Sequence, residues 1–246
     1  MNVLNFVFPG ALGAISGSFL ATVIYRLQRG ISLVGRSKCP YCGCVIQFYR
    51  NVPILSFLFQ KGRCAYCGHK ISLLYPVVEL VGMILWIWAF GCLDVENAIL
   101  FVWVSSVLIV IGFIDGEYLK IPLFLMLLAA CGIFVAVVVG ALEWRMVLVG
   151  GVFAFVFLSG VRAMYYRIRG VEGLGFGDIL LGTLIGGWLG VRGFLFVIIA
   201  SSTMGLMWFI LVSIRCGWDR NRKIPFGTFM SAISIFYVVM KFYFIK

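Results

Sequence analysis

Residues 98–115 read AILFVWVSSVLIVIGFID, a long uncharged run that ends at Asp115. A helix needs about twenty predominantly apolar residues to cross a bilayer, and this run approaches that length. A carboxylate at the edge of such a run is costly to hold near lipid, and it marks a functional site by default. The stretch therefore predicts a membrane-spanning helix that ends at a functional acid.

Further apolar runs of similar length recur along the chain. The sequence is 63% hydrophobic and only 12% charged, and its mean hydropathy is +1.11. A soluble domain is about 25% charged, so this composition excludes an ordinary soluble globule. We expect an all-α polytopic membrane protein with about eight transmembrane helices. The expected spans are residues 3–25, 76–92, 98–114, 121–140, 146–164, 178–191, 193–214 and 226–243.

The 20 Lys and Arg residues outnumber the 9 Asp and Glu residues, which gives a net charge of +11. Most of these basic residues lie in the segments expected on one side of the membrane. If residues 26–75 face the cytoplasm, the eight spans put 16 of the 20 Lys and Arg residues on that side. The positive-inside rule then predicts that both termini lie outside and that Asp115 and Asp178 lie at the cytoplasmic ends of helices. The charge is accounted for by topology and by anionic lipid headgroups, so we expect membrane lipids as partners and no nucleic acid.

The polar stretch 26–75 carries two Cys-x-x-Cys knuckles, Cys39/Cys42 and Cys64/Cys67, with 21 residues between them. Four thiolates form a closed tetrahedral set for a structural zinc ion. We expect a small cytoplasmic zinc-ribbon-like insert between the first two transmembrane helices, which a metal would help to fold. The alternative is a pair of disulfides or free thiols, and a reducing cytoplasm disfavours it.

Cys44 and His69 are spare candidates beside the knuckles, and Cys92, Cys131 and Cys216 are interpreted as small hydrophobic residues. We find no internal repeat. The chain divides into a first transmembrane helix (1–25), a cytoplasmic four-cysteine zinc-binding domain (26–75) and a second transmembrane domain (76–246) that contains Asp115 and Asp178.

A second acid, Asp178, follows the string Gly175-Phe176-Gly177 at the start of the short, glycine-rich sixth span. Small residues allow helices to approach closely, so this span is expected inside the bundle. Two carboxylates held close share a proton, and such a pair can hydrolyse a peptide bond by acid and base catalysis. Taken singly, Asp115 is also compatible with a solvated loop carboxylate, and Asp178 with a helix N-cap.

These motifs resemble, in order and over most of the chain, those of the type IV prepilin peptidase family, or prepilin leader peptidases. The matching residues are 17–20 with 23–27, 36–79 including 51–53, 114–115 with Pro122, 172–178 and 224–227. The resemblance implies an aspartic endopeptidase of the Gly-x-Gly-Asp type in the bacterial inner membrane, with its active site and cysteine domain on the cytoplasmic side. It implies Asp115 and Asp178 as the catalytic pair.

The resemblance also implies the substrate and the cofactors. Family members remove the basic leader of prepilins or pseudopilins, in type IV pilus and type II secretion systems, after a glycine and just before an apolar helix. Many then methylate the new N-terminus with S-adenosyl-L-methionine, an activity associated with the cysteine domain. By the same resemblance Cys39, Cys42, Cys64 and Cys67 bind zinc. A bifunctional peptidase and N-methyltransferase is therefore expected, and a peptidase without methylation is the alternative.

The chain departs from the usual family pattern at four positions. Ala21 replaces Asn, Leu123 replaces an acidic residue, Leu180 replaces Lys, and Thr228 replaces Pro. Arg26 and Glu79 are candidates for a methyl-donor site, but we interpret them as a structural ion pair at the mouth of a helix. A small transporter or channel, in which the two aspartates relay protons, is the rival from another functional class, and the paired knuckles argue against it.

Overall fold

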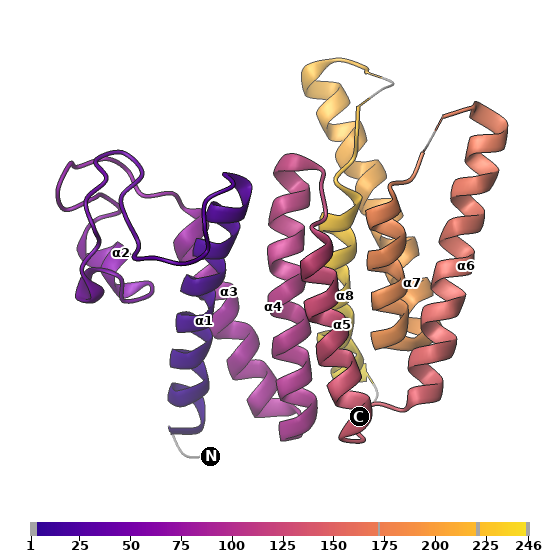
Figure 1. Ribbon diagram of the computed structural model, residues 1–246, viewed down its shortest axis with the longest axis horizontal. Coiled ribbons are helices and arrows are strands. Elements are labelled where there is room, and N and C mark those ends of the chain that lie inside the picture. The colour runs from indigo at the N-terminus through magenta and orange to yellow at the C-terminus, as the bar shows by residue number, and fades with distance from the viewer. Residues whose placement is uncertain (1–3, 172, 220–221, 245–246) are drawn as a thin grey trace. The chain divides into compact units, whose positions relative to one another are not determined.

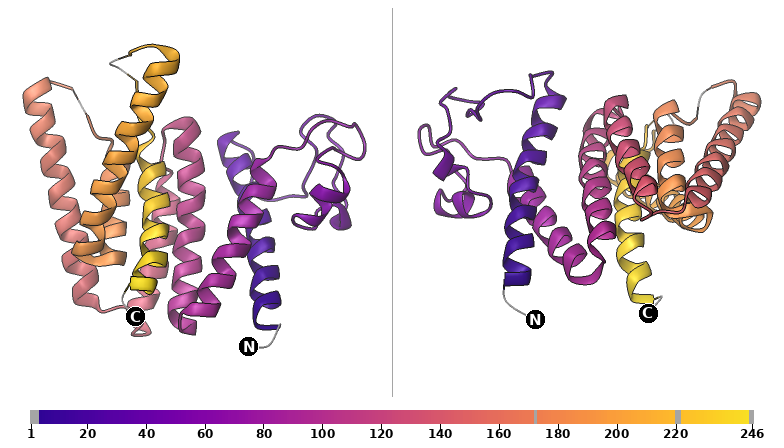
Figure 2. Two further views of the ribbon diagram at one scale, coloured as in Figure 1. Left: turned by 180° about the vertical axis from the view of Figure 1, so that it is seen from behind. Right: turned by 60° about the horizontal axis from the view of Figure 1, so that its bottom comes forward.

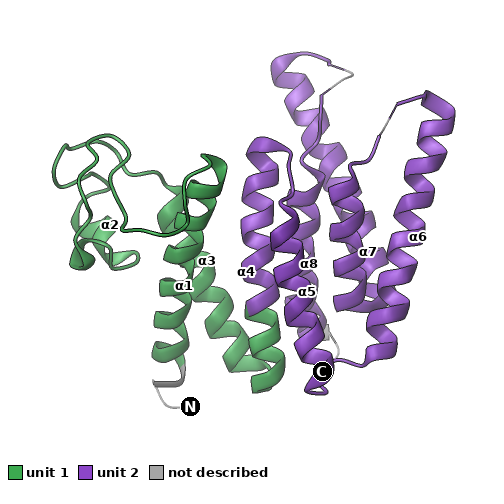
Figure 3. Cartoon of the chain, in the orientation of Figure 1, with its two compact units in different colours: residues 1–102 green, residues 103–246 purple. Residues whose placement is uncertain are grey.

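The computed structural model describes residues 4–171, 173–219 and 222–244, and Glu172 of the second aspartate motif lies outside them. Within the described residues the chain is helical and has no β-strand. It forms two compact units, residues 1–102 and 103–246 (Figure 3). The all-helical class expected from the sequence is confirmed.

The first unit contains a helix pair and the polar insert. Helix α1 (Leu4–Gln28) packs against α3 (Leu74–Cys92), and the insert lies between them in the sequence. The insert has little regular structure: one 3-10 turn (Phe48–Arg50), the short helix α2 (Leu55–Phe59) and two isolated β-bridges. The sequence did not predict α2, because five residues give no clear helical period.

The second unit is a helical bundle (Figures 1 and 2). Helix α4 (Val95–Tyr118) enters it from the first unit, and α5, α6, α7 and α8 follow. These four helices are Leu123–Val138, Trp144–Arg169, Phe176–Cys216 and Phe226–Phe244. In this unit α7 packs against α6 and α8, with a smaller contact to α5. Helix α7 is therefore the central element of the bundle.

Helix α7 is broken at Gly190, whose φ of 72° and ψ of 177° are not helical. A positive φ is accessible to glycine at little cost, so the break falls where the sequence permits it. The chain then turns back, and Phe194 lies against the first half of the helix near Gly182. The two halves correspond to the expected spans 178–191 and 193–214, so each of the eight predicted segments is found as a helix.

Six described helices are long and apolar enough to cross a membrane, and the apolar α5 is shorter. The chain is therefore a multi-pass membrane protein. The expected burial of the glycine-rich span is confirmed: the first half of α7 is mostly buried, including Gly182, Gly186 and Gly187. At its centre Gly150 of α6 meets the backbone of Gly186 so closely that a Cβ on Gly150 would overlap the Gly186 carbonyl oxygen.

Candidate active site and metal centre

Asp115 lies in the last turn of α4 and is 5% exposed, so it is not the solvated loop carboxylate that the sequence left open. Its Oδ2 accepts a hydrogen bond of 2.8 Å from the backbone N–H of Thr228, in the first turn of α8. The backbone of Gly227 also faces this carboxylate, and a Cβ there would lie 3.1 Å from Oδ2. The start of α8 therefore holds Asp115 in place.

Thr228 was noted in the sequence only as a replacement for proline, and its contact with Asp115 was not predicted. Its hydroxyl donates to the carbonyl oxygen of Gly112 at 2.8 Å and lies 3.3 Å from Asp115 Oδ2. Proline has no backbone N–H and no hydroxyl, so it could supply neither contact. The threonine thus gives this chain a donor to Asp115 that a proline at the same position cannot provide.

Asp178 lies in the first turn of α7, three residues after the N-cap. The N-cap is Gly175, so the interpretation of Asp178 as the N-cap residue is wrong. Its carboxylate instead turns back toward the cap, and a Cβ on Gly175 would lie 3.1 Å from Asp178 Oδ2. Asp178 is the third helical residue, the position whose side chain reaches back to the cap in a capping box. The carboxylate therefore lies at the N-terminus of α7.

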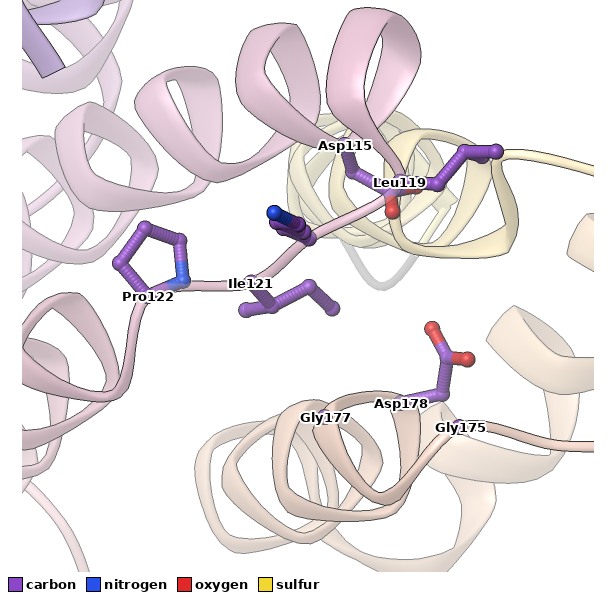
Figure 4. Close-up of a pocket in the computed structure, with 8 residues that line it drawn as sticks. Asp115, Leu119, Ile121, Pro122, Gly175, Gly177 and Asp178 are labelled. Atoms are coloured by element: carbon purple, nitrogen blue, oxygen red, sulfur yellow. The ribbon is translucent and has the colours of Figure 1, made fainter. Parts of the chain in front are cut away.

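Asp115 and Asp178 line one pocket of ≈ 450 Å³ and interact electrostatically. Figure 4 shows both carboxylates facing this pocket, Asp115 from α4 and Asp178 from α7. The connection between α4 and α5 forms another wall, with Lys120, Ile121 and Pro122. Two carboxylates facing one cavity can act as acid and base on a bound substrate, and the remaining lining is compatible with a peptide. Their catalytic roles stay a prediction.

The four knuckle cysteines lie together in the insert. Their sulfur atoms are all within 4.8 Å of one another, and the sulfurs of Cys39 and Cys67 are 3.9 Å apart. With Zn–S bonds of about 2.3 Å, tetrahedral coordination places sulfur atoms about 3.8 Å apart. All four cysteines are free thiols in the structure, and the separation of Cys39 from Cys67 is nearly twice a disulfide bond. Cys39, Cys42, Cys64 and Cys67 therefore fit a metal ion.

The two knuckles have the same backbone structure, which contradicts the expectation of no internal repeat. The N–H of Cys39 donates to the carbonyl of Cys44, and the N–H of Cys64 donates to the carbonyl of His69 in the same way. Further equivalent bonds follow, from residue 43 to 39 and 68 to 64, and from 46 to 37 and 71 to 62. The signal was present in the sequence as Cys-x-Tyr-Cys-Gly at an offset of 25 residues.

Cys44 and His69, the spare candidates, occupy equivalent positions in this repeat and lie outside the thiol cluster. The His69 ring stacks on Tyr41 with 3.2 Å between centroids, so it packs between the knuckles. The thiol cluster therefore contains the four predicted cysteines and neither spare residue.

Backbone donors shape the acidity of two of these thiols. The N–H groups of Cys67 and Tyr66 point to the sulfur of Cys64 and lower its pKa to about 7. The N–H of His69 favours the thiolate of Cys67 too, but desolvation and the three neighbouring thiols outweigh it and raise the pKa of Cys67 to about 12. Four thiolates this close repel one another, and a divalent cation bound among them would relieve that repulsion.

Arg26 and Glu79 join the insert to its helix pair, and they do so through the backbone. The Arg26 guanidinium donates to four carbonyl oxygens between Ser32 and Arg36, at 2.7 to 3.2 Å. Glu79 accepts the N–H of Ile54 at 2.7 Å, and Ile54 has a positive φ of 61°. The expected ion pair is replaced by these bonds, which hold the first residues of the insert on α1 and its middle on α3.

Comparison with known proteins adds family relationships to this geometry. The model of the Bacterial Peptidase A24 N-terminal domain matches residues 11–92, and that of the Type IV leader peptidase family matches residues 101–210. The second match begins at residue 101, next to the division between the two compact units at residues 102 and 103. No solved structure matches the chain.

Curated relatives match over most of the chain. A prepilin leader peptidase/N-methyltransferase of Bacillus subtilis (strain 168) is 32% identical, over 91% of this chain and 89% of the relative. Proteins with the same name match from Myxococcus xanthus (34% identical, over 86% of this chain and 64% of the relative) and Dichelobacter nodosus (29% identical, over 93% and 89%).

Proposed function

The chain belongs to the type IV leader peptidase family, and we propose that it removes the leader of prepilins with Asp115 and Asp178 as its catalytic pair. The observation that carries the proposal is the single pocket that both carboxylates line. In the reaction one aspartate, ionised, takes a proton from the attacking water. The other, protonated, donates to the oxygen of the scissile carbonyl, so no metal and no covalent intermediate is needed.

The position of the pocket suits a substrate that is half in the membrane. Asp115 lies in the last turn of α4 and Asp178 in the first turn of α7, so the pocket is at the ends of apolar helices. The positive-inside rule assigns this end to the cytoplasm. A prepilin presents its basic leader there and its apolar helix in the bilayer. The bond between the two segments would then lie at the depth of the aspartates in a bacterial inner membrane.

We further propose that the cysteine cluster binds a structural zinc ion and that the chain methylates its product. The four sulfur ligands leave no open coordination position, so the ion would stabilise the insert and take no part in chemistry. The names of the relatives include N-methyltransferase activity, which supports methyl transfer from S-adenosyl-L-methionine to the new N-terminus.

Replacing each aspartate tests the catalytic pair. We expect Asp115→Asn and Asp178→Asn each to abolish cleavage of a co-expressed prepilin, because an amide can neither accept nor carry the proton. Glu117→Gln is the matched control: this exposed carboxylate lies two residues from Asp115 and does not line the pocket. Mass spectrometry of the prepilin measures the outcome. Leader removal by Asp178→Asn at the wild-type rate would refute the protease assignment and favour a proton-relay role.

The same product separates the two candidate activities. A peptidase alone leaves an unmodified N-terminus, whereas a bifunctional enzyme adds a methyl group when S-adenosyl-L-methionine is present. Incubating the purified protein with prepilin and isotopically labelled methyl donor therefore decides between them. Cleaved product without label, at full cleavage, would reduce the function to the peptidase.

A further inference from the structure

A second concavity, of ≈ 540 Å³, lies among α5, α6 and α7 in the same unit as the aspartate pocket. Helix α5 lines it at helical spacing from Leu123 to Val137, and α7 lines it from Leu180 to Gly187. The lining is apolar except for Thr183, whose hydroxyl donates to the carbonyl of Ile179 at 2.8 Å. We call this concavity the apolar groove.

The apolar groove begins where the aspartate pocket ends. Pro122 lines the pocket, and the next residue, Leu123, lines the groove. On the facing helix Asp178 lines the pocket, and Leu180 lines the groove. The two helices therefore continue from one cavity into the other without an intervening element, and leucines stand at the junction.

The dimensions of the groove suit a helix. From Leu123 to Val137 the lining runs along α5 for about 21 Å at a rise of 1.5 Å per residue, the length of about four helical turns. Ala130, Gly151 and Gly187 line it with small side chains or none. Small residues allow a second helix to approach closely in a membrane, where packing drives association.

We propose that the apolar groove holds the apolar helix that follows the scissile bond of the substrate. The inference rests on the proposed function. When the scissile bond lies between the aspartates, the residues after it must leave the pocket toward the membrane, and the groove starts at that exit. A lipid chain could also cover an apolar surface, but nothing would tie a lipid to the aspartate end. The substrate helix is covalently tied there.

If the proposal is right, the groove contributes to the binding of full-length prepilin, which has the apolar helix, and not to the binding of a peptide without it. Ala130 is exposed and lines the groove, and its neighbour Cys131 is exposed but does not line it. Ala130→Trp fills the groove, and Cys131→Trp adds the same bulk on another face of α5. For full-length prepilin we expect Ala130→Trp to raise KM by about tenfold or more, with kcat little changed. Cys131→Trp leaves KM unchanged.

A truncated substrate separates binding in the groove from damage to the active site. A soluble peptide with the leader and only two or three residues beyond the cleavage site ends before Ala130, which lies about 10 Å beyond the start of the groove at Leu123. We expect wild type, Ala130→Trp and Cys131→Trp to cleave it equally well. If the two variants have the same KM for full-length prepilin and cleave it normally, the groove does not bind the substrate helix. That result would overturn this proposal and leave the proposed function unaffected. A wild-type protein that cleaves no prepilin would overturn both.

Cross-linking gives an independent measurement if the tryptophan variant fails to fold. Leu127 lines the groove and is 60% exposed, and Val135 is 56% exposed on another face of α5. A benzophenone amino acid at either position, in an Asp178→Asn background that holds the prepilin uncleaved, reports on its neighbours. We expect cross-links from position 127, and not from 135, to the first turns of the prepilin helix. Cross-links from 127 only to lipid, or to a second copy of this chain, would overturn the proposal.

Discussion

The carboxylate of Asp115 leaves little space for a side chain at Gly227. A Cβ there would lie 3.1 Å from both Cγ and Oδ2 of Asp115 and 2.9 Å from Cδ1 of Ile121. We therefore expect Gly227→Ala to displace the carboxylate and to lower kcat by about ten- to a hundredfold, because sub-ångström errors in position are costly in catalysis. Initial rates of prepilin cleavage measure this. Gly112→Ala is the control, since its Cβ would meet Ser231 at an ordinary 3.5 Å, and equal rates in the two variants would contradict the assigned role of Gly227.

Single residues also mark how far the sequence could predict the site. Asp115, Asp178 and the four cysteines were identifiable because acids beside apolar runs and paired thiols are rare without a purpose. The donor to Asp115 was not, because it is a backbone N–H from a helix 113 residues away in the sequence. Such a contact depends on how α8 meets α4, which no local pattern of side chains encodes.

Among the elements, α6 and α7 approach each other through their glycines. A Cβ on Gly150 would overlap the Gly186 carbonyl oxygen, whereas one on the adjacent Gly151 would lie 3.5 Å from the Thr183 carbonyl oxygen. We expect Gly150→Ala to destabilise the bundle by about 1–3 kcal/mol, the usual range for overpacking. Gly151→Ala is expected to leave stability unchanged. Thermal unfolding in detergent measures both variants. Similar midpoints would show that α6 and α7 can move apart to accommodate a Cβ at position 150 without loss of stability.

The elements themselves were predictable to different degrees. The length of each apolar run located the long apolar helices, because every helix that crosses a bilayer needs about twenty predominantly apolar residues. It also separated the two halves of α7, with the expected boundary at residue 192, two residues after the observed break at Gly190. In the insert there is no such requirement, so α2 and the 25-residue repeat of the knuckles were missed. There the fold depends on a few backbone hydrogen bonds around the thiols.

On the scale of the whole molecule, the two candidate sites belong to different units. The cysteine cluster lies within residues 1–102, and every residue that lines the aspartate pocket lies within 103–246. A metal-dependent insert below about 70 residues folds only when its ligands hold the ion, because its apolar core is small. Loss of the ion should therefore unfold the insert, while the aspartate pocket keeps its own packing.

We thus expect Cys39→Ser and Cys64→Ser each to lose bound zinc and to lose methylation before proteolysis. Zinc content by elemental analysis reports the first effect, and the masses of cleaved and methylated prepilin report the second from one sample. Cys44→Ser is the control, because Cys44 lies outside the thiol cluster, and it should retain zinc and both activities. A strong chelator applied to the wild-type protein should reproduce the cysteine variants. Cleavage that falls in step with methylation would mean that the aspartate pocket depends on the insert, and the two units would then have to be regarded as one functional body.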